Sequence, residues 1–171
     1  KARISPLYPI VKDLDPYWFQ DEEYREYILK LFDDIVLNSD EPANLAMTGL
    51  VTNAYLYTGD DKYKNWVLEY VEAWMDRIVQ NDGIIPDNIG PTGIIGERRG
   101  GQWWGGIHGW NRLYHTPGFR ILIGLAIGAE CAQLLSGDNG YLDLLRSQIK
   151  VMLDRGKKRD DGQLIVPTRH G

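Results

Sequence analysis

The sequence predicts an all-α protein, an array of helical hairpins in which uncharged helices alternate with amphipathic ones. Apolar residues recur at three- and four-residue spacing in residues 21–36 and 61–79, which is typical of helices with one solvent-facing side. Residues 43–57 and 119–135 are instead apolar nearly all round. The unit of uncharged helix, Gly-Asp turn and amphipathic helix occurs twice, which indicates an internal repeat.

The first amphipathic helix follows an extended, proline-containing segment, residues 1–20. Its charged residues lie opposite an apolar face, so we expect one side to be in water. That face consists of Tyr24, Tyr27, Ile28, Leu31, Phe32, Ile35 and Val36.

The next helix, residues 43–57, carries no charged residue and is therefore expected to be surrounded by protein. Thr58-Gly59-Asp60 ends it, because glycine is the usual helix terminator. The aspartate then offers a side-chain acceptor to the free amides of the helix over residues 61–79.

The repeat has a constant offset of 78 residues, because Ser136-Gly137-Asp138 matches Thr58-Gly59-Asp60 (138 − 60 = 78). At this offset Asp154-Arg155 corresponds to Asp76-Arg77. Asp161-Gly162 corresponds to Asp82-Gly83 if one residue is inserted in the second repeat. We therefore expect uncharged helices inside and amphipathic helices outside, with the longer Asp-Gly connections together at one end.

One such connection, residues 82–117, interrupts the helical pattern. It holds nine of the 19 glycines, three of the six tryptophans and two of the three histidines. A loop of this length in a compact domain is typically functional. Glycines let the backbone approach a ligand and tryptophans offer broad apolar faces, so we expect this loop to line a cleft.

Length and composition fit a single domain over residues 1–171. The formal charge of −5 and the lack of a basic tract argue against nucleic acid as a partner. The longest apolar run, residues 121–129, is too short to span a bilayer, so no membrane segment is expected. The single Cys131 forms no internal disulfide, and the compartment stays open because a mature secreted chain would look the same.

A carbohydrate ligand suits the composition of the loop, because sugar rings present apolar faces and polar rims. Tryptophan faces and polar side chains would bind them together. The candidate substrate-binding residues are Trp103, Trp104, Trp110, Asn88, Gln102, Arg98, Arg99, Arg112 and His115.

Glycoside hydrolysis needs two carboxylates, one as acid and one as base or nucleophile. The loop contains Asp82, Asp87 and Glu97. Asp82 has a repeat counterpart in a turn, which favours a structural role. Asp87 and Glu97 are therefore the candidate catalytic pair.

A β-eliminating lyase needs a base beside a uronate carboxylate and positive charge to stabilise the enolate. His108, Tyr114 or His115 would act as base or acid, and Arg98 or Arg99 would neutralise the carboxylate. His108 and His115 lack the spacing and cysteines of a zinc site, and the glycines follow no strand. We therefore expect no metal and no cofactor.

The repeated helix, Thr-Gly-Asp turn and Asp-Gly connection over residues 21–167 resemble the (α/α) toroid proteins called six-hairpin glycosidase-like. This resemblance implies a carbohydrate-active enzyme, either a glycoside hydrolase or a polysaccharide lyase, and slightly favours a secreted or periplasmic location. Residues 103–110 are distantly similar to the loop of unsaturated glucuronyl hydrolases. Their Arg-Gly-Asn/Gln-Gly/Ala-Trp motif is interrupted here by Ile107-His108, so their catalytic aspartates are not carried over.

A closed toroid needs about six hairpins, and this sequence predicts one outer helix and two full pairs. We expect an incomplete array that further segments of the same protein, or other chains, complete. The sequence thus predicts a glycoside hydrolase acting on a poly- or oligosaccharide by carboxylate acid/base catalysis. The alternatives are a uronate-cleaving polysaccharide lyase and a non-catalytic module that binds glycan or protein.

Overall fold

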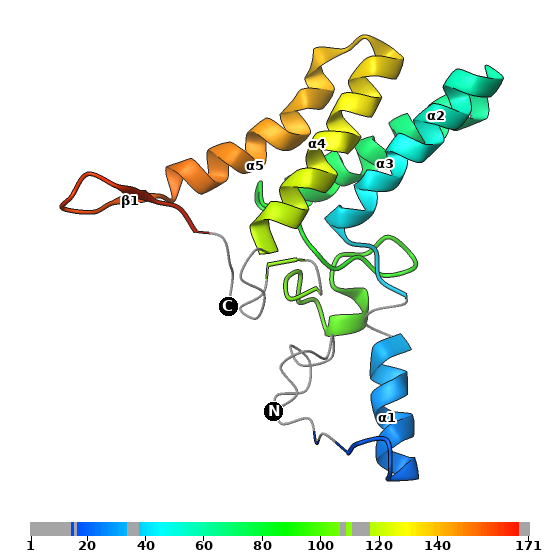
Figure 1. Ribbon diagram of the computed structural model, residues 1–171, viewed down its shortest axis with the longest axis vertical. Coiled ribbons are helices and arrows are strands. Elements are labelled where there is room, and N and C mark those ends of the chain that lie inside the picture. The colour runs from blue at the N-terminus through cyan, green and yellow to red at the C-terminus, as the bar shows by residue number, and fades with distance from the viewer. Residues whose placement is uncertain (1–14, 16, 34–37, 107–108, 111–116, 168–171) are drawn as a thin grey trace.

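The computed structural model describes residues 15, 17–33, 38–106, 109–110 and 117–167, without the side chains of 117–119 (Figure 1). Helices dominate these residues, which confirms the all-α class. None of the described helices has the length and apolarity needed to cross a membrane. The elements are α1 (Glu22–Phe32), η2 (Pro42–Met47), α2 (Thr48–Thr58), α3 (Asp61–Gln80), η3 (Glu97–Arg99), α4 (Pro117–Ser136), η4 (Asn139–Leu142), α5 (Asp143–Asp154), β1 (Lys157–Lys158) and β2 (Leu164–Ile165).

The turn between α2 and α3 forms as its sequence predicts. Gly59 ends α2 in the left-handed region, with φ of 67°. The Thr58 hydroxyl donates to the Ala54 carbonyl at 2.7 Å and accepts from the Asp60 amide at 3.2 Å. The Asp60 carboxylate then accepts from the Lys62 amide at 3.0 Å and so caps α3.

The turn between α4 and η4 repeats these interactions 78 residues later (138 − 60 = 78). Gly137 has φ of 76°. The Ser136 hydroxyl donates to the Ala132 carbonyl at 2.7 Å and accepts from the Asp138 amide at 3.0 Å. Asp138 accepts from the Gly140 amide at 2.8 Å. The turn of the predicted repeat is thus confirmed at the level of individual hydrogen bonds.

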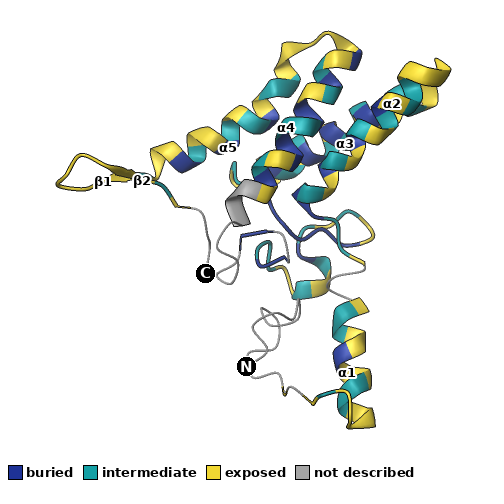
Figure 2. Cartoon of the chain, viewed as in Figure 1, coloured by how far each residue is buried: buried dark blue, intermediate teal, exposed yellow. Residues whose placement is uncertain are grey.

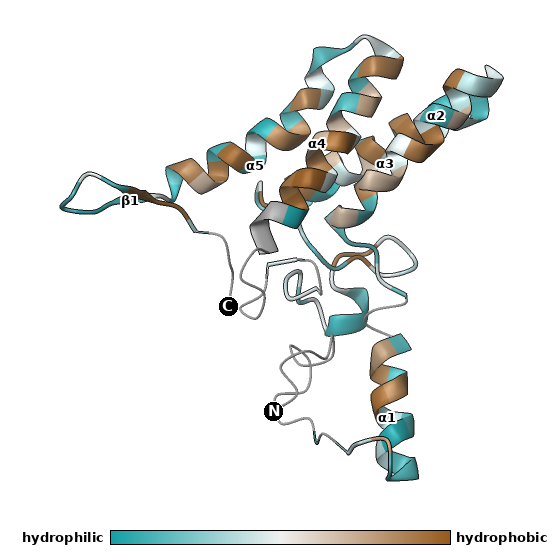
Figure 3. Ribbon diagram, in the orientation of Figure 1, coloured by the Kyte–Doolittle hydropathy of each residue, from teal (hydrophilic) through white to brown (hydrophobic). Residues whose placement is uncertain are grey.

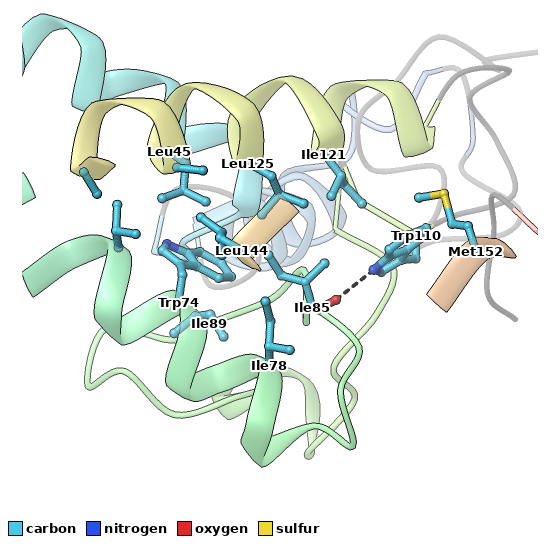
Figure 4. Close-up of a cluster of buried hydrophobic side chains, with 13 residues drawn as sticks. Leu45, Trp74, Ile78, Ile85, Ile89, Trp110, Ile121, Leu125, Leu144 and Met152 are labelled. Atoms are coloured by element: carbon cyan, nitrogen blue, oxygen red, sulfur yellow. Dashed lines mark hydrogen bonds between the residues drawn. The ribbon is translucent and has the colours of Figure 1, made fainter. Parts of the chain in front are cut away.

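Helix α4 occupies the centre of the helical array and packs against α2, α3, α5 and η2. A Cβ on Gly124 would overlap the Pro42 carbonyl, so glycine permits the close approach of η2. Leu45 of η2 and Leu125 of α4 are completely buried in the core between them (Figure 4). The sequence predicts that protein surrounds the uncharged helix at residues 119–135. The structure confirms this for the face of α4 that makes these contacts.

Helix α2 differs from the prediction that protein surrounds it. Only Thr48 and Thr52 are buried, whereas Leu50, Leu56 and Tyr57 are exposed by 64%, 62% and 94% (Figure 2). Figure 3 shows the hydropathy of each residue along this helix. Enclosure needs an element on every face, and the described part of the chain supplies neighbours only on some of them.

The start of that uncharged segment also differs in geometry. Residues 42–47 form the 3-10 helix η2 rather than the first turns of an α-helix. Pro42 stands at its N-terminus, and the buried Thr48 hydroxyl bonds the Leu45 carbonyl at 2.6 Å where η2 passes into α2.

Helix α1 stands apart from the array of α2 to α5 (Figure 1). Asp21 caps its N-terminus by accepting from the Tyr24 amide. Ile28 is completely buried in a small local cluster with Trp18, Tyr24, Leu31 and Phe32. The predicted continuation over residues 34–36 lies outside the described residues.

The long connection between α3 and α4 is attached to the helices through Ile85. The buried Gln148 of α5 accepts from the Ile85 amide at 2.8 Å and donates to the Gly83 carbonyl at 3.0 Å. The Trp110 indole donates to the Ile85 carbonyl at 2.8 Å (Figure 4). The corresponding segment after α5 instead forms the antiparallel hairpin β1–β2, which the sequence did not predict.

We predict that Gln148→Leu destabilises the fold by about 3 kcal/mol, because it leaves a buried amide and carbonyl without partners. The exposed Gln163→Leu is the matched control and should change stability by less than about 0.5 kcal/mol. Urea denaturation of both variants measures the difference. Equal stabilities would contradict the role of Gln148.

Candidate functional site

The side chain of Asp87 is completely buried inside the glycine- and tryptophan-rich loop. One carboxylate oxygen accepts from the Gly106 amide at 2.9 Å. The other accepts from the Gly105 amide at 3.1 Å and from the Trp110 amide. The Asp87 amide donates to the Trp103 carbonyl at 2.8 Å. We call Asp87 and these three amide donors the Asp87 cluster.

The glycines of this loop allow the backbone to close around Asp87. A Cβ on Gly109 would overlap the Asp87 carboxylate, and one on Gly106 would overlap the Asp87 carbonyl. The sequence predicts that these glycines let the backbone approach a ligand. In the structure they let it approach Asp87 of the same chain.

The electrostatics of the Asp87 cluster involve a second buried carboxylate and a guanidinium. Burial raises the pKa of Asp87 to about 6, and the amides of Gly106, Trp110 and Gly105 and the charge of Arg99 oppose the rise. Burial lowers the pKa of Arg99, while the charges of Asp87 and Glu41 raise it. Glu41 is 8% exposed. The site thus places two carboxylates and one guanidinium around residues 105 and 106.

Glu41 was missed by the sequence reasoning, although a signal was present. It lies in the short link before η2, next to Asp40, which pairs with Ile89 of the long connection. Its carboxylate approaches Gly106 so closely that a Cβ there would crowd it.

The three tryptophans of the loop pack against the core. Trp110 is 6% exposed and uses its indole N–H within the chain, and Trp103 and Trp104 are half-buried against the same cluster. Trp103, Trp110, Met152 and neighbouring residues enclose a hollow of about 40 Å³. Small-molecule sites begin at roughly 300 Å³, so this hollow is too small to be a binding site for a sugar ring.

Glu97, the proposed partner of Asp87, interacts within its own turn. Its carboxylate accepts from the amide and the hydroxyl of Thr92 at 3.1 and 2.8 Å. A Cβ on Gly90 would overlap the Glu97 side chain. The structure therefore places Glu97 as the residue that closes the turn over residues 90–97, while Asp87 binds residues 105–110.

Some of the remaining polar candidates lie among the described residues and the others do not. The amide of Gln102 and the guanidinium of Arg99 both donate to the Trp104 carbonyl, at 2.7 and 3.1 Å. Asn88 is completely buried, and Arg98 is exposed. The other candidates lie outside the described residues, namely His108, Arg112, Tyr114 and His115.

A larger cavity, of about 310 Å³, opens beside the first part of the loop. This volume is at the lower end of the range of small-molecule sites, roughly 300–1,000 Å³. We call it the Asp40 cleft. Its lining residues are Asn38, Ser39, Asp40, Arg77, Ile89, Gly90, Pro91 and Gly93.

Asp40 is fixed in the wall of this cleft. The Tyr70 hydroxyl donates to the two carboxylate oxygens of Asp40, at 2.8 and 2.9 Å. The side-chain amide of Asn44 donates to one of these oxygens at 2.9 Å. Arg77 lies 3.9 Å away. Burial and the Asp40 charge raise the pKa of Tyr70 further above neutral pH.

The backbone of Asp40 also joins the cleft to the loop. The Asp40 amide donates to the Ile89 carbonyl at 2.7 Å, and the Ile89 amide donates to the Asp40 carbonyl at 3.0 Å. The sequence reasoning did not select Asp40 or Arg77, although Arg77 was part of the recognised repeat.

The fold and the site define an all-α helical-hairpin protein with a polar cleft beside its longest connection. The chain belongs to the family described as Domain of unknown function (DUF8034), whose model matches residues 7–170. No curated protein and no solved structure matches the chain. The described residues contain no group of three or more His, Cys, Asp or Glu side chains that would hold a metal ion.

We predict that Asp87→Asn lowers the free energy of unfolding by about 2–4 kcal/mol, because the amide group turns an acceptor into a donor facing other donors. Asp82→Asn in the same loop is the control. Asp82 is exposed with φ of 53°, a conformation that asparagine tolerates well. Chemical denaturation tests the pair, and an equal loss in both variants would contradict the structural role of Asp87.

The pH dependence of stability provides a second prediction. The ordinary pKa of the Asp87 carboxyl is 3.8 and that in the folded chain is about 6. Between these values the folded state binds more protons, so rising pH favours unfolding. The stability of the wild type relative to Asp87→Asn should therefore fall between about pH 4 and pH 6 and level off above. If the stability of the wild type relative to Asp87→Asn rose over this pH range, the pKa of Asp87 in the folded chain would lie below its ordinary value of 3.8.

Proposed function

We propose that the protein is a carbohydrate-active enzyme, a glycoside hydrolase whose poly- or oligosaccharide substrate binds in the Asp40 cleft. One observation carries this proposal. The cleft is large enough for a small ligand and has a fixed carboxylate and a guanidinium in its wall. The repeated turn between paired helices adds to the resemblance to the (α/α) toroid enzymes, a fold that hosts several chemistries and therefore does not choose among them.

The lining of the cleft suits sugar hydroxyls, each of which both donates and accepts hydrogen bonds. Asp40 supplies acceptors, Arg77 supplies donors, and Asn38 and Ser39 add groups of both kinds. The exposed Pro91 adds apolar surface for the C–H face of a ring.

We assign the role of catalytic carboxylate to Asp40 in place of Asp87, the residue that the sequence indicated. Asp87 is completely buried and its oxygens are occupied by backbone amides. Asp40 has a side chain that is 27% exposed and oriented by Tyr70. In this role Asp40 either takes the proton of the water that attacks the anomeric carbon, or itself bonds to that carbon as the glycosidic bond breaks and is later released by water. In both cases the leaving oxygen takes a proton from a general acid. Tyr70 and Asn44 hold Asp40 in place. The described residues that line the cleft contain no second carboxylate, so the general acid is not assigned.

Charge favours hydrolysis over β-elimination in this cleft. A lyase needs positive charge that is free to neutralise a uronate carboxylate. Asp40 already balances Arg77 at 3.9 Å. Arg99, the earlier candidate, donates to the Trp104 carbonyl beside two buried carboxylates.

We predict that the wild-type chain releases reducing ends from a neutral polysaccharide and that Asp40→Asn lowers the rate by about 100-fold or more. Asp76→Asn, on the exposed side of α3, is the matched control and should retain full activity. A panel of neutral and uronate-containing polysaccharides is assayed for reducing ends and for the ultraviolet absorbance of unsaturated products.

Two outcomes would contradict this assignment. An ultraviolet-absorbing product would establish a lyase. Binding without turnover by the wild type would establish a non-catalytic glycan-binding module.

A further inference from the structure

The guanidinium of Arg77 lies between Trp74 and Asp40 at the wall of the Asp40 cleft. It lies over the ring of the buried Trp74, 5.0 Å from the ring centroid. Its side chain is 15% exposed. Gly93 also lines the cleft and lies beside the guanidinium, because a Cβ at this position would stand 3.5 Å from Arg77 Nη2. A group held in this way loses little further conformational freedom when it binds a ligand.

Arg77 has fewer hydrogen-bond acceptors than its donors require. In the described part of the chain its buried Nη1 has no hydrogen-bond partner. Its ion pair with Asp40, at 3.9 Å, is longer than a hydrogen bond. Unpaired buried donors are rare in folded proteins. This one is covered, but it belongs to a partly exposed side chain that lines the Asp40 cleft, so the residue that lacks an acceptor is also one that a ligand would meet.

The pair of Asp40 and Arg77 carries no net charge, which favours a neutral ligand over an anionic one. An anionic group that approached Arg77 would also meet the Asp40 carboxylate and be repelled by it. A hydroxyl accepts from the guanidinium and donates to the carboxylate, so it satisfies both residues.

We propose that Asp40 and Arg77 form a subsite that holds adjacent hydroxyls of a neutral sugar unit between carboxylate and guanidinium. This inference rests on the proposed carbohydrate function and narrows its substrate class to neutral glycans. Arg77 is then a binding residue that sets specificity.

The repeat provides the matched control. Arg155 occupies the position of Arg77 in the second repeat (155 − 77 = 78). It is exposed and borders only the hollow of about 40 Å³. Arg155→Gln therefore removes the same charge from the chain without touching the Asp40 cleft.

The experiment measures binding by calorimetry to cello-, xylo- and manno-oligosaccharides and to oligogalacturonate. We expect at least one neutral oligosaccharide to bind the wild type more tightly than oligogalacturonate does. Arg77→Gln should weaken that binding by about tenfold or more, because a hydrogen bond to a charged group is lost. Arg155→Gln should leave it unchanged.

A second measurement uses only the wild type, in case Arg77→Gln fails to fold. The arginine side-chain Nε–H signals are recorded by ¹⁵N NMR during titration with the same sugars. The Arg77 signal should shift and that of Arg155 should not.

Three results would overturn the subsite: undiminished binding by folded Arg77→Gln, preference for oligogalacturonate, or no binding of any of these sugars. Binding with a shifted Arg77 signal but without turnover would support the subsite and refute the hydrolase.

Discussion

The carboxylate of Asp87 is buried among three backbone amides, and the geometry of the long loop depends on this arrangement. Removing a carboxylate from water is unfavourable unless hydrogen bonds replace the water. Donors from Gly105, Gly106 and Trp110 reach it only where the backbone wraps closely, and this requires glycine at residues 106 and 109. One charge therefore determines both the path and the composition of this segment.

Alternate residues after α3 connect this interaction to the cleft. Ile85 is bound on both sides, by Gln148 and by the Trp110 indole. Asp87 is bound by the loop, and Ile89 pairs with the backbone of Asp40. Because these residues follow one another at a spacing of two, a displacement at Asp87 would pass to the wall of the cleft. The buried carboxylate is thus a positioning group, and the exposed one is the candidate for chemistry.

Local interactions of the fold were predictable from the sequence. The Gly-Asp turns and the helix caps depend on residues within a few positions of one another, so short patterns reveal them, and the recurrence of these patterns reveals the repeat. The exposure of Leu50 and Tyr57 on α2 was not predictable, because a helix pattern does not specify which neighbouring elements are present. The hairpin β1–β2 likewise replaced the connection expected from the first repeat.

The candidate site was predictable only in part, because its interactions join distant residues. Tryptophan and glycine composition does not distinguish a ligand-binding surface from a loop packed on its own aspartate, and Trp110 belongs to the core. Asp40 contacts Tyr70 thirty residues away, and no spacing rule relates them. The repeat did contain a clue, since Arg77 lies near the end of the helix that precedes the long connection.

Amide hydrogen exchange at Gly105, Gly106 and Trp110 tests the central claim most directly. If the Asp87 carboxylate binds these amides, they will exchange slowly, at rates near those of core helix amides in α4, although they lie in a loop. Exchange as fast as that of the exposed Gly100 in the same loop would contradict the buried carboxylate as the organising interaction.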